Sequence, residues 1–254
     1  MLALIILSII QGLTEFLPVS SSGHLVIAKE WLGFHEHGLE MELWLHVATL
    51  VALVVYFRDD IFALFGSFFK KDGNPVDKKW VWLILLSTVI TGVVGVVFRK
   101  ALLGTFEDLR LTYIGFIVTA IILLATPWTR EKREEITYLD AVLFGLVQAF
   151  SILPSISRSG ATIALLLLLG IHRGTAFRFS FIASIPAILG AFLLEVGVGS
   201  FSIFTPLQLA VTFVVTFIFG LLSLAFLRQF VVQQKFYYFG FYCLAIGVIG
   251  LIFF

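Results

Sequence analysis

Long apolar segments constrain this chain more than any other feature of its sequence. Six of them are candidate membrane spans, at residues 43–57, 80–98, 111–128, 177–198, 206–227 and 236–254. A spanning helix needs roughly 20 predominantly apolar residues. The chain is 60% hydrophobic and 13% charged, against about 45–50% and about 25% in average soluble domains. It is therefore predicted to be an all-α polytopic membrane protein with about six transmembrane helices.

Two further apolar regions, 1–32 and 138–171, are interrupted at their centres by polar runs that contain proline and glycine. The runs read Pro-Val-Ser-Ser-Ser-Gly-His at 18–24 and Pro-Ser-Ile-Ser-Arg-Ser-Gly at 154–160. Irregular backbone within a membrane is tolerated only where protein or a wet cavity satisfies its polar groups. Both regions are predicted to be re-entrant, broken helices, whereas the segment 61–69 is too short to span and is expected at the interface.

The two interrupted regions also resemble each other. Gly-Leu-Thr-Glu-Phe at 12–16, followed by the first polar run, is similar to Gly-Leu-Val-Gln-Ala-Phe at 145–150, followed by the second. Three candidate spans separate the copies, and an odd number inverts one copy relative to the other. We predict a single membrane domain over residues 1–254, built of two inverted repeats at about 1–128 and 138–254. Such repeats place their sites at the repeat interface, so the two serine-rich turns are expected to meet in one pocket.

Charge and cysteine content exclude several classes of function. With 17 Lys and Arg against 16 Asp and Glu, the net charge of +1 leaves no basic face for nucleic acid. The single cysteine, Cys243, cannot form an intramolecular disulfide, and no Cys/His cluster has zinc-ligand spacing. By the positive-inside rule, the cytoplasmic side is expected to hold the basic clusters at 58–79, 130–133, 173–178 and 228–235.

Glu15 is the first candidate for chemistry. Gln11 and Glu15 are four residues apart and share one face of a helix, and an ionisable residue inside a membrane is a functional candidate by default. Glu15 could act as a general base, or could hold Mg²⁺ or Ca²⁺ with Gln11 as a supporting ligand and phosphate oxygens completing the shell. The alternative is a pore-lining or helix-packing carboxylate bonded to the backbone.

Four small residues, Ser20, Ser21, Ser22 and Gly23, lead into the next apolar segment. A hydroxyl-rich turn at a helix N-terminus is an anion site, and one hydroxyl could be a nucleophile if Glu15 or the following His24 takes its proton. His24 could also accept the phosphoryl group or protonate the leaving group. Helix N-capping by the serines and a structural histidine are the alternatives.

The second turn adds a guanidinium. Arg158 recognises phosphate bidentately if it faces the pocket, and it would stabilise the charge that develops during phosphoryl transfer. The alternatives are an internal salt bridge to Glu15 and an unrelated gating role. Its neighbours are further candidates for phosphate binding: Ser157, Ser159, Gly160 and Thr162.

The runs at 11–25 and 154–162 resemble the two signature motifs of the undecaprenyl-diphosphate phosphatase family of the bacitracin-resistance type. The resemblance extends over nearly the whole chain, including Leu45-His46 and the segment 185–191. It implies a bacterial plasma-membrane enzyme that releases the terminal phosphate of a C55 isoprenoid diphosphate, which regenerates the monophosphate carrier for cell-wall synthesis. It also implies dependence on a divalent cation and a headgroup site open to the outer face.

By this resemblance, the family's acidic motif falls on Gln11 and Glu15, its serine and histidine on Ser21 and His24, and its arginine on Arg158. The candidate catalytic residues are Glu15, Ser21, His24 and Arg158, with Ser21 as the preferred nucleophile or hydroxyl relay and His24 as its proton-transfer partner. The candidate phosphate-binding residues are Gln11, Ser20, Ser22, Gly23, Ser157, Ser159, Gly160 and Thr162.

Four positions depart from the family pattern. Gln11 stands where many members have Glu, Ser22 where Thr is common, Ser155 where Gly is common, and Cys243 where Arg is expected. Attack by water activated by Glu15 stays open, as do a transporter or flippase of a lipid-linked phosphate, a phosphatase for another prenyl diphosphate, and a homodimeric assembly.

Overall fold

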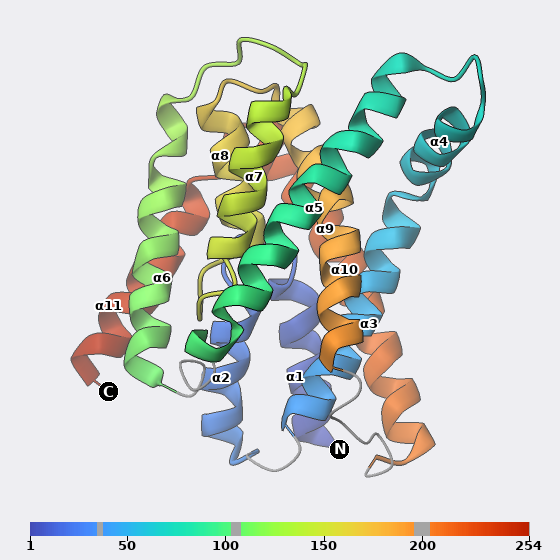
Figure 1. Cartoon of the computed structure of the whole chain (residues 1–254). Helices are drawn as coiled ribbons and strands as arrows, with labels where there is room; N and C mark the ends of the chain where they lie inside the picture. The colour runs from blue at the N-terminus through green and yellow to red at the C-terminus, as the bar shows by residue number, and fades with distance from the viewer. Residues whose placement is uncertain (35–37, 103–107, 196–203, 254) are drawn as a thin grey trace.

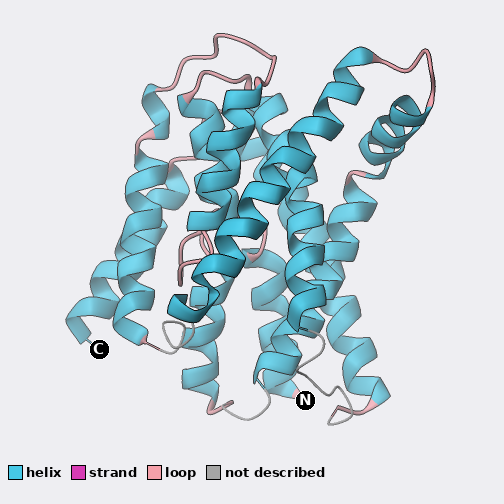
Figure 2. Cartoon of the chain, in the orientation of Figure 1, coloured by secondary structure: helices cyan, strands magenta, loops and turns pink. Residues whose placement is uncertain are grey.

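The computed structural model describes residues 1–34, 38–102, 108–195 and 204–253 (Figure 1). This part of the chain is helical apart from its connections and one isolated bridge between Arg133 and Ile171 (Figure 2). The elements are α1 Leu2–Thr14, α2 Ser21–Leu32, α3 Gly38–Tyr56, α4 Arg58–Phe69, α5 Pro75–Leu102, α6 Leu109–Leu124, the 3₁₀ turn η1 Thr126–Trp128, α7 Tyr138–Phe150, α8 Arg158–Leu168, α9 Arg173–Glu195, α10 Pro206–Val232 and α11 Tyr238–Phe253.

The prediction of an all-α polytopic membrane protein is confirmed. In the described ranges, four helical stretches are long and apolar enough to cross a bilayer: Pro75–Phe98, Leu109–Trp128, Arg173–Leu193 and Pro206–Val232. The two other expected spans are helical in α3 and α11, and α4 has only 12 residues. The helix α9 begins four residues before its apolar segment, because backbone hydrogen bonding continues past the point where hydropathy falls.

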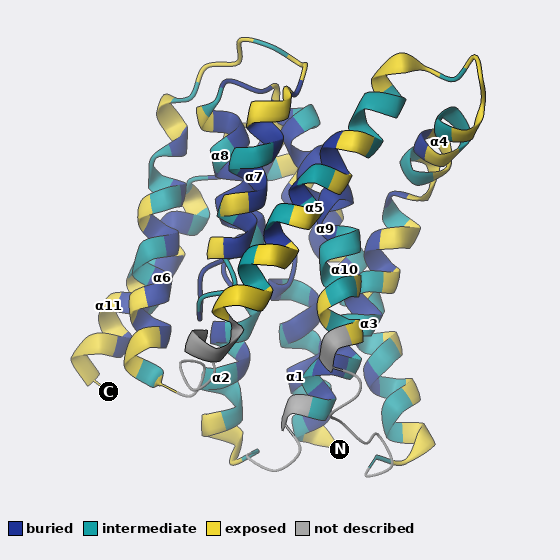
Figure 3. Cartoon of the chain, in the orientation of Figure 1, coloured by how far each residue is buried: buried dark blue, intermediate teal, exposed yellow. Residues whose placement is uncertain are grey.

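The outside of the molecule is apolar. On α5, Val89, Val93 and Val96 lie close to one helical face and each is about 60% exposed. Segments coloured as exposed or intermediate recur along the helices over the full height of the bundle (Figure 3). Soluble proteins rarely expose apolar patches of this extent, so lipid is the solvent that this surface fits.

Both interrupted regions are helical hairpins with irregular tips, as predicted. The first is α1 and α2, joined by residues 15–20, and the second is α7 and α8, joined by 151–157. Figure 1 shows the two hairpins entering from opposite ends of the molecule, with their tips near its middle. The tips touch: a Cβ on Gly23 would lie 2.5 Å from Ser155 Oγ, and one on Gly160 would lie 3.2 Å from Pro18 Cβ. The two serine-rich turns therefore meet, as the sequence predicts.

The hairpins have matching partners in the two halves of the chain. The helix α1 packs on α10, and α7 packs on α5. A Cβ on Gly12 or Gly145 would meet a backbone oxygen of the facing helix at 2.7 or 2.8 Å, respectively. The carbonyl of Gly12 accepts a hydrogen bond from Ser223 at 2.9 Å, and that of Gly145 accepts one from Thr91 at 3.0 Å. Each hairpin thus packs on a long helix from the other half of the chain, as a two-fold relation between the repeats requires. The repeat boundaries stay a prediction.

The connection between the two halves is tied down at one end of the molecule. Arg133 N–H donates to the carbonyl of Gly170 at 3.1 Å, and His172 N–H donates to the carbonyl of Arg133 at 2.9 Å. The Arg133 guanidinium also makes a bidentate pair with Asp140 at 2.6 and 2.8 Å. The connection between α4 and α5 lies at this same end, opposite the N- and C-termini (Figure 1).

Candidate active site

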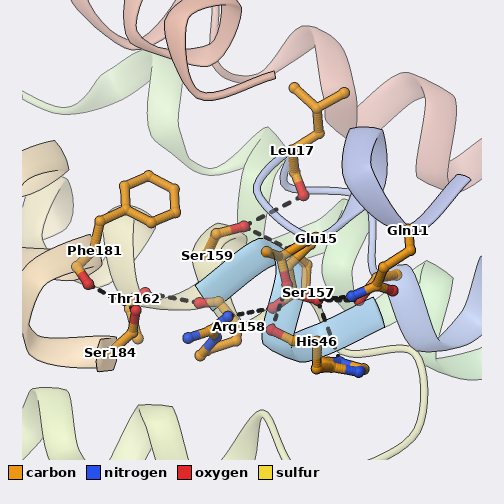
Figure 4. Close-up of polar contacts among 12 residues, drawn as sticks. Gln11, Glu15, Leu17, His46, Ser157, Arg158, Ser159, Thr162, Phe181 and Ser184 are labelled. Carbon is orange, nitrogen blue, oxygen red and sulfur yellow. Dashed lines mark hydrogen bonds and ion pairs between the residues drawn. The ribbon is translucent and has the colours of Figure 1, made fainter. Parts of the chain in front are cut away.

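Glu15 is the centre of a buried polar cluster between the hairpin tips (Figure 4). Its Oε2 accepts hydrogen bonds from Ser21 Oγ at 2.7 Å and from Gln11 Nε2 at 3.1 Å. Its Oε1 accepts one from Arg158 Nη2 at 2.6 Å. The side chain of Glu15 is only 6% exposed. The structure thus brings together three of the four residues that the sequence predicts as catalytic, and adds Gln11.

The first tip reverses the chain sharply enough to return Ser21 to Glu15. The helix α1 ends at Thr14, four residues before Pro18. Proline has no backbone N–H to donate and cannot continue a helix. Ser20 adopts φ 66° and caps α2, its hydroxyl accepting from Gly23 N–H at 3.3 Å. Ser21 is consequently the first residue of α2, at the positive end of its dipole.

The second tip is built in the same way. Ser157 caps α8 by accepting from Gly160 N–H at 3.1 Å, so Arg158 is the first residue of that helix. Thr119 of α6 fixes this tip, because its hydroxyl accepts from Ser157 N–H at 3.0 Å and donates to the carbonyl of Ser155 at 3.1 Å. Two helix N-termini therefore face one cluster, and each favours an anion.

Two buried polar atoms of the cluster have no hydrogen-bond partner within the described chain. They are Arg158 Nη1 and Gln11 Oε1. Buried polar groups are satisfied in the large majority of cases, and a free guanidinium nitrogen can donate to a phosphate oxygen. The arrangement can bind an anion at Arg158 while Glu15 still accepts the Ser21 hydroxyl.

The remaining serines bond within the tips. Ser22 Oγ lies 3.1 Å from Ser20 Oγ, and Ser159 Oγ lies 3.3 Å from Ser157 Oγ. Ser159 also donates to the carbonyl of Leu17 at 3.3 Å, which links the second tip to the first. These contacts lie within each tip and between the two tips, and the role of the four hydroxyls in phosphate binding stays a prediction.

Thr162 points away from Glu15. Its hydroxyl donates to the carbonyl of Arg158 at 2.7 Å and lies 2.8 Å from Ser180 Oγ of α9. Thr162 therefore anchors the first turn of α8 against α9. Arg158 is the first residue of that turn.

His24 faces a different partner from the one that the sequence suggests. Its Nδ1 lies 2.7 Å from the carbonyl of Ser20, and its Nε2 lies 2.7 Å from the hydroxyl of Tyr242, on which the ring is stacked. Within the described residues, no hydrogen bond or ion pair joins His24 to Glu15 or Ser21. Sequence reasoning missed Tyr242, since nothing in its surroundings marks it as a partner of a residue more than 200 positions away.

A second histidine, which sequence reasoning did not place in the site, does reach Glu15. His46 Nε2 of α3 lies 3.5 Å from Glu15 Oε2. The signal that could have found it is its position within the apolar segment 43–57, because ionisable residues inside a membrane are functional candidates.

Of the departures from the family pattern, Ser155 lies in the second tip and Cys243 contacts the first. Ser155 has φ 58°, a left-handed conformation that favours glycine, and its buried hydroxyl has no partner in the described part of the chain. Cys243 is buried in α11, with its Sγ 3.7 Å from the carbonyl of Pro18. Neither removes a contact to Glu15.

The cluster contains a single carboxylate. Across the described residues, no three His, Cys, Asp or Glu side chains lie close enough together to hold a metal ion by themselves. Glu15 and the free Oε1 of Gln11 supply two oxygen ligands, and Mg²⁺ is usually bound by one or two carboxylates together with substrate phosphates. These residues therefore fit a divalent cation only when a phosphate supplies further ligands.

Comparison with known proteins gives consistent matches over the full length. Residues 4–249 match the family described as bacitracin resistance protein BacA. The chain is 34% identical to undecaprenyl-diphosphatase 1 of Shouchella clausii, an alignment that covers 100% of this chain and 96% of that protein. It is 37% identical to undecaprenyl-diphosphatase of Treponema denticola, with 96% and 94% covered, and 36% identical to that of Methanosphaera stadtmanae, with 99% and 97% covered.

Proposed function

The chain belongs to the bacitracin resistance protein BacA family, and from this premise we propose that it is a membrane phosphatase that hydrolyses undecaprenyl diphosphate to undecaprenyl phosphate and inorganic phosphate. One observation carries the proposal beyond the names of the relatives. A hydroxyl and a carboxylate, Ser21 and Glu15, are hydrogen-bonded at 2.7 Å beside a guanidinium that keeps one buried nitrogen free. This is a nucleophile, a base and an anion site in one cluster.

The diphosphate binds between the hairpin tips. Arg158 donates from Nη1 to an oxygen of the terminal phosphate, while Nη2 stays paired with Glu15. The N-termini of α2 and α8 add favourable electrostatics from two directions. The C55 chain extends into the lipid, which the apolar outer surface of the helices already faces.

Ser21 attacks the terminal phosphorus. As the new O–P bond forms, the Ser21 proton passes to Glu15 Oε2, and the anhydride P–O bond breaks to release undecaprenyl phosphate. A water oxygen then bonds to the phosphorus of the phosphoserine and the bond from Ser21 Oγ to phosphorus breaks, which releases inorganic phosphate. The proton on Glu15 returns to Ser21 Oγ, which restores both the hydroxyl and the carboxylate. Arg158 stabilises the charge that develops on the transferred group. Direct attack by a water molecule held on Glu15 is the competing route, and it leaves no covalent intermediate.

A divalent cation, Mg²⁺ or Ca²⁺, is part of the proposal. Glu15 and Gln11 Oε1 would hold it together with diphosphate oxygens, and it would neutralise phosphate charge. Gln11 has a second role in either case, because its Nε2 donates to Glu15 and keeps the carboxylate oriented.

We further propose that the protein lies in the bacterial plasma membrane with the headgroup site open to the outer face. The basic clusters at 58–79 and 130–133 lie at the end of the molecule that is opposite the N-terminus. If that end is cytoplasmic, as the positive-inside rule favours, the α1–α2 hairpin enters from outside. A lipid-phosphate carrier is not favoured, because binding alone does not require a hydroxyl bonded to a buried carboxylate.

The decisive experiment measures inorganic phosphate released from undecaprenyl diphosphate by the purified protein in detergent. Wild-type protein should turn over, and Ser21→Ala should lose activity by at least about 10³-fold if Ser21 is the nucleophile. When the substrate carries ³²P in its terminal phosphate, rapid acid quenching should trap the label on Ser21. Activity without any trapped label, together with an active Ser21→Ala protein, would replace the serine route by the water route. Folded wild-type protein that binds the lipid without releasing phosphate would refute the proposed function.

A further inference from the structure

His24 makes two hydrogen bonds that the mechanism above does not use. Its Nδ1 lies 2.7 Å from the backbone carbonyl of Ser20, and its Nε2 lies 2.7 Å from the hydroxyl of Tyr242 in α11. The ring is stacked on that of Tyr242, with 3° between their planes, and its plane is at 82° to that of Phe116 in α6. These contacts connect the residue directly before Ser21 to a helix near the C-terminus.

The direction of each hydrogen bond follows from the chemistry of the groups. A carbonyl oxygen only accepts, so the hydrogen of the neutral imidazole is on Nδ1. Nε2 then presents a lone pair, and the Tyr242 hydroxyl donates to it. The uncharged ring therefore satisfies both contacts. Because the bond made by one ring nitrogen decides which tautomer is present, the Tyr242 hydroxyl favours the tautomer in which His24 donates to Ser20.

The backbone of Ser20 needs to be held in place. Ser20 has φ 66° and ψ 105°, and a residue other than glycine stays in so sparsely populated a conformation only when its surroundings hold it there. Its carbonyl accepts from His24 twice, from the backbone N–H at 3.4 Å and from Nδ1 at 2.7 Å. The ring nitrogen makes the shorter contact, and the carbonyl belongs to the peptide group that joins Ser20 to Ser21.

We infer that Tyr242 and His24 are positioning residues of the site. The Tyr242 hydroxyl keeps the hydrogen of His24 on Nδ1, and that hydrogen holds the peptide group before Ser21. Since a peptide group is planar, a fixed carbonyl also fixes the point from which Ser21 starts, and so keeps its hydroxyl 2.7 Å from Glu15. The inference rests on the proposed function, because it assigns the placement of the proposed nucleophile.

Two substitutions of His24 test this role. His24→Asn keeps an amide donor near the position of Nδ1 and has no tautomer to select. His24→Phe keeps a ring between Tyr242 and Phe116 but has no donor. For phosphate release from undecaprenyl diphosphate, kcat should stay within about fivefold of wild type for Asn and fall by about 10²-fold for Phe. KM should change by less than about threefold in both, because Arg158 and the N-terminus of α8 stay in place.

A double-mutant cycle tests the role of Tyr242. Tyr242→Phe keeps the stacked ring and removes only the hydroxyl, and it should lower kcat by about tenfold. In the His24→Asn background, the same substitution should change kcat by less than about twofold, because an amide donor does not depend on Tyr242. The matched control is Tyr238→Phe, at the first residue of α11, whose ring is stacked on Tyr237. It should stay within about twofold of wild type.

The outcomes are distinguishable from failure of the proposed function. If wild-type protein releases no phosphate, the function itself is refuted. If wild type is active and His24→Asn loses as much kcat as His24→Phe, the positioning role of His24 is refuted, since a proton-transfer role predicts equal losses. Full activity of His24→Phe also refutes it.

The cycle decides the role of the hydroxyl separately. An effect of Tyr242→Phe that persists undiminished in the His24→Asn background refutes action through the tautomer. Thermal unfolding in detergent, measured on every variant, separates a local effect on turnover from a loss of fold. If His24→Phe does not fold, His24→Asn and the cycle still decide, because neither depends on that variant.

Discussion

Arg158 Nη2 lies 2.6 Å from Glu15 Oε1, and the second terminal nitrogen of the same guanidinium is buried without a partner in the described chain. The pair joins residues that are 143 positions apart and belong to different hairpins. It orients the base on one side and leaves a donor for an incoming phosphate on the other. The site is therefore assembled before substrate arrives.

Replacing the Arg158 guanidinium by the ammonium group of lysine should show whether one side chain must contact Glu15 and the phosphate at the same time. Arg158→Lys keeps a positive charge but has one nitrogen for two acceptors. We expect kcat to fall by about 10²–10³-fold, as when a single transition-state donor is removed. Phosphate release in detergent measures it. Arg178→Lys is the control, since Arg178 pairs with Asp60 away from the cluster and should stay within about twofold of wild type. Near-normal turnover in Arg158→Lys would contradict the proposal that the guanidinium binds Glu15 and the phosphate at the same time.

Removal of divalent cations should abolish phosphate release, and Mg²⁺ or Ca²⁺ should restore it. The half-activating concentration should depend on residue 11, because Gln11 supplies a neutral oxygen where a second carboxylate would bind more tightly. Gln11→Glu should lower that concentration by about tenfold, and Gln11→Met should raise it. A titration of activity against free cation measures both. Full activity of the wild type in excess chelator would remove the cation from the proposal.

Ser155→Gly should stabilise the protein. Ser155 has φ 58° and a buried hydroxyl that no described group satisfies, so glycine relieves backbone strain and removes an unsatisfied group. We expect a gain of about 0.5–1 kcal/mol, seen as a higher Tm in detergent.

Ser20→Gly is the matched comparison. Ser20 has a similar φ of 66°, but its hydroxyl caps α2 through Gly23 N–H. Relief of strain is then offset by loss of the cap, and the gain should be smaller than that for Ser155→Gly. Equal gains at the two positions would show that the unsatisfied hydroxyl of Ser155 does not contribute.

Asp140→Asn should loosen the link between the two halves. One oxygen of Asp140 accepts from Thr137 N–H at 2.7 Å, and the carboxylate makes the bidentate pair with Arg133. An amide can satisfy only part of this network, and we expect a loss of about 2 kcal/mol and a lower Tm. Glu135→Gln, at a carboxylate that is 75% exposed, should leave Tm almost unchanged, because solvent screens the charge of an exposed ion pair. Equal effects of the two substitutions would contradict the importance of the buried network.

The fold was largely predictable from local patterns. Apolar length identified the spanning segments, and the polar runs at 18–24 and 154–160 identified the two hairpin tips, because proline, glycine and serine end helices wherever they occur together. Element boundaries were less predictable. The start of α9 at Arg173 lies outside its apolar segment, since hydropathy reports the membrane environment and not the backbone hydrogen bonds that define a helix.

The site was predictable to the extent that its residues lie in the tips. Glu15, Ser21 and Arg158 meet as expected, because each occupies an end of a helix whose position the hairpins determine. His24 and Thr162 lie one turn further along their helices, where rotation about the helix axis decides the direction of a side chain. The first faces Tyr242 and the second faces Ser180.

By itself, the sequence determined that this chain is a helical membrane protein with two broken helices, and that an acid, a hydroxyl and a guanidinium lie at the breaks. Those features follow from composition, hydropathy and spacing along the chain. Tertiary structure alone decided that His46 reaches Glu15 while His24 does not. The physical reason is that contacts between separate helices depend on how the helices pack and rotate against each other, and no local pattern in the sequence records that rotation.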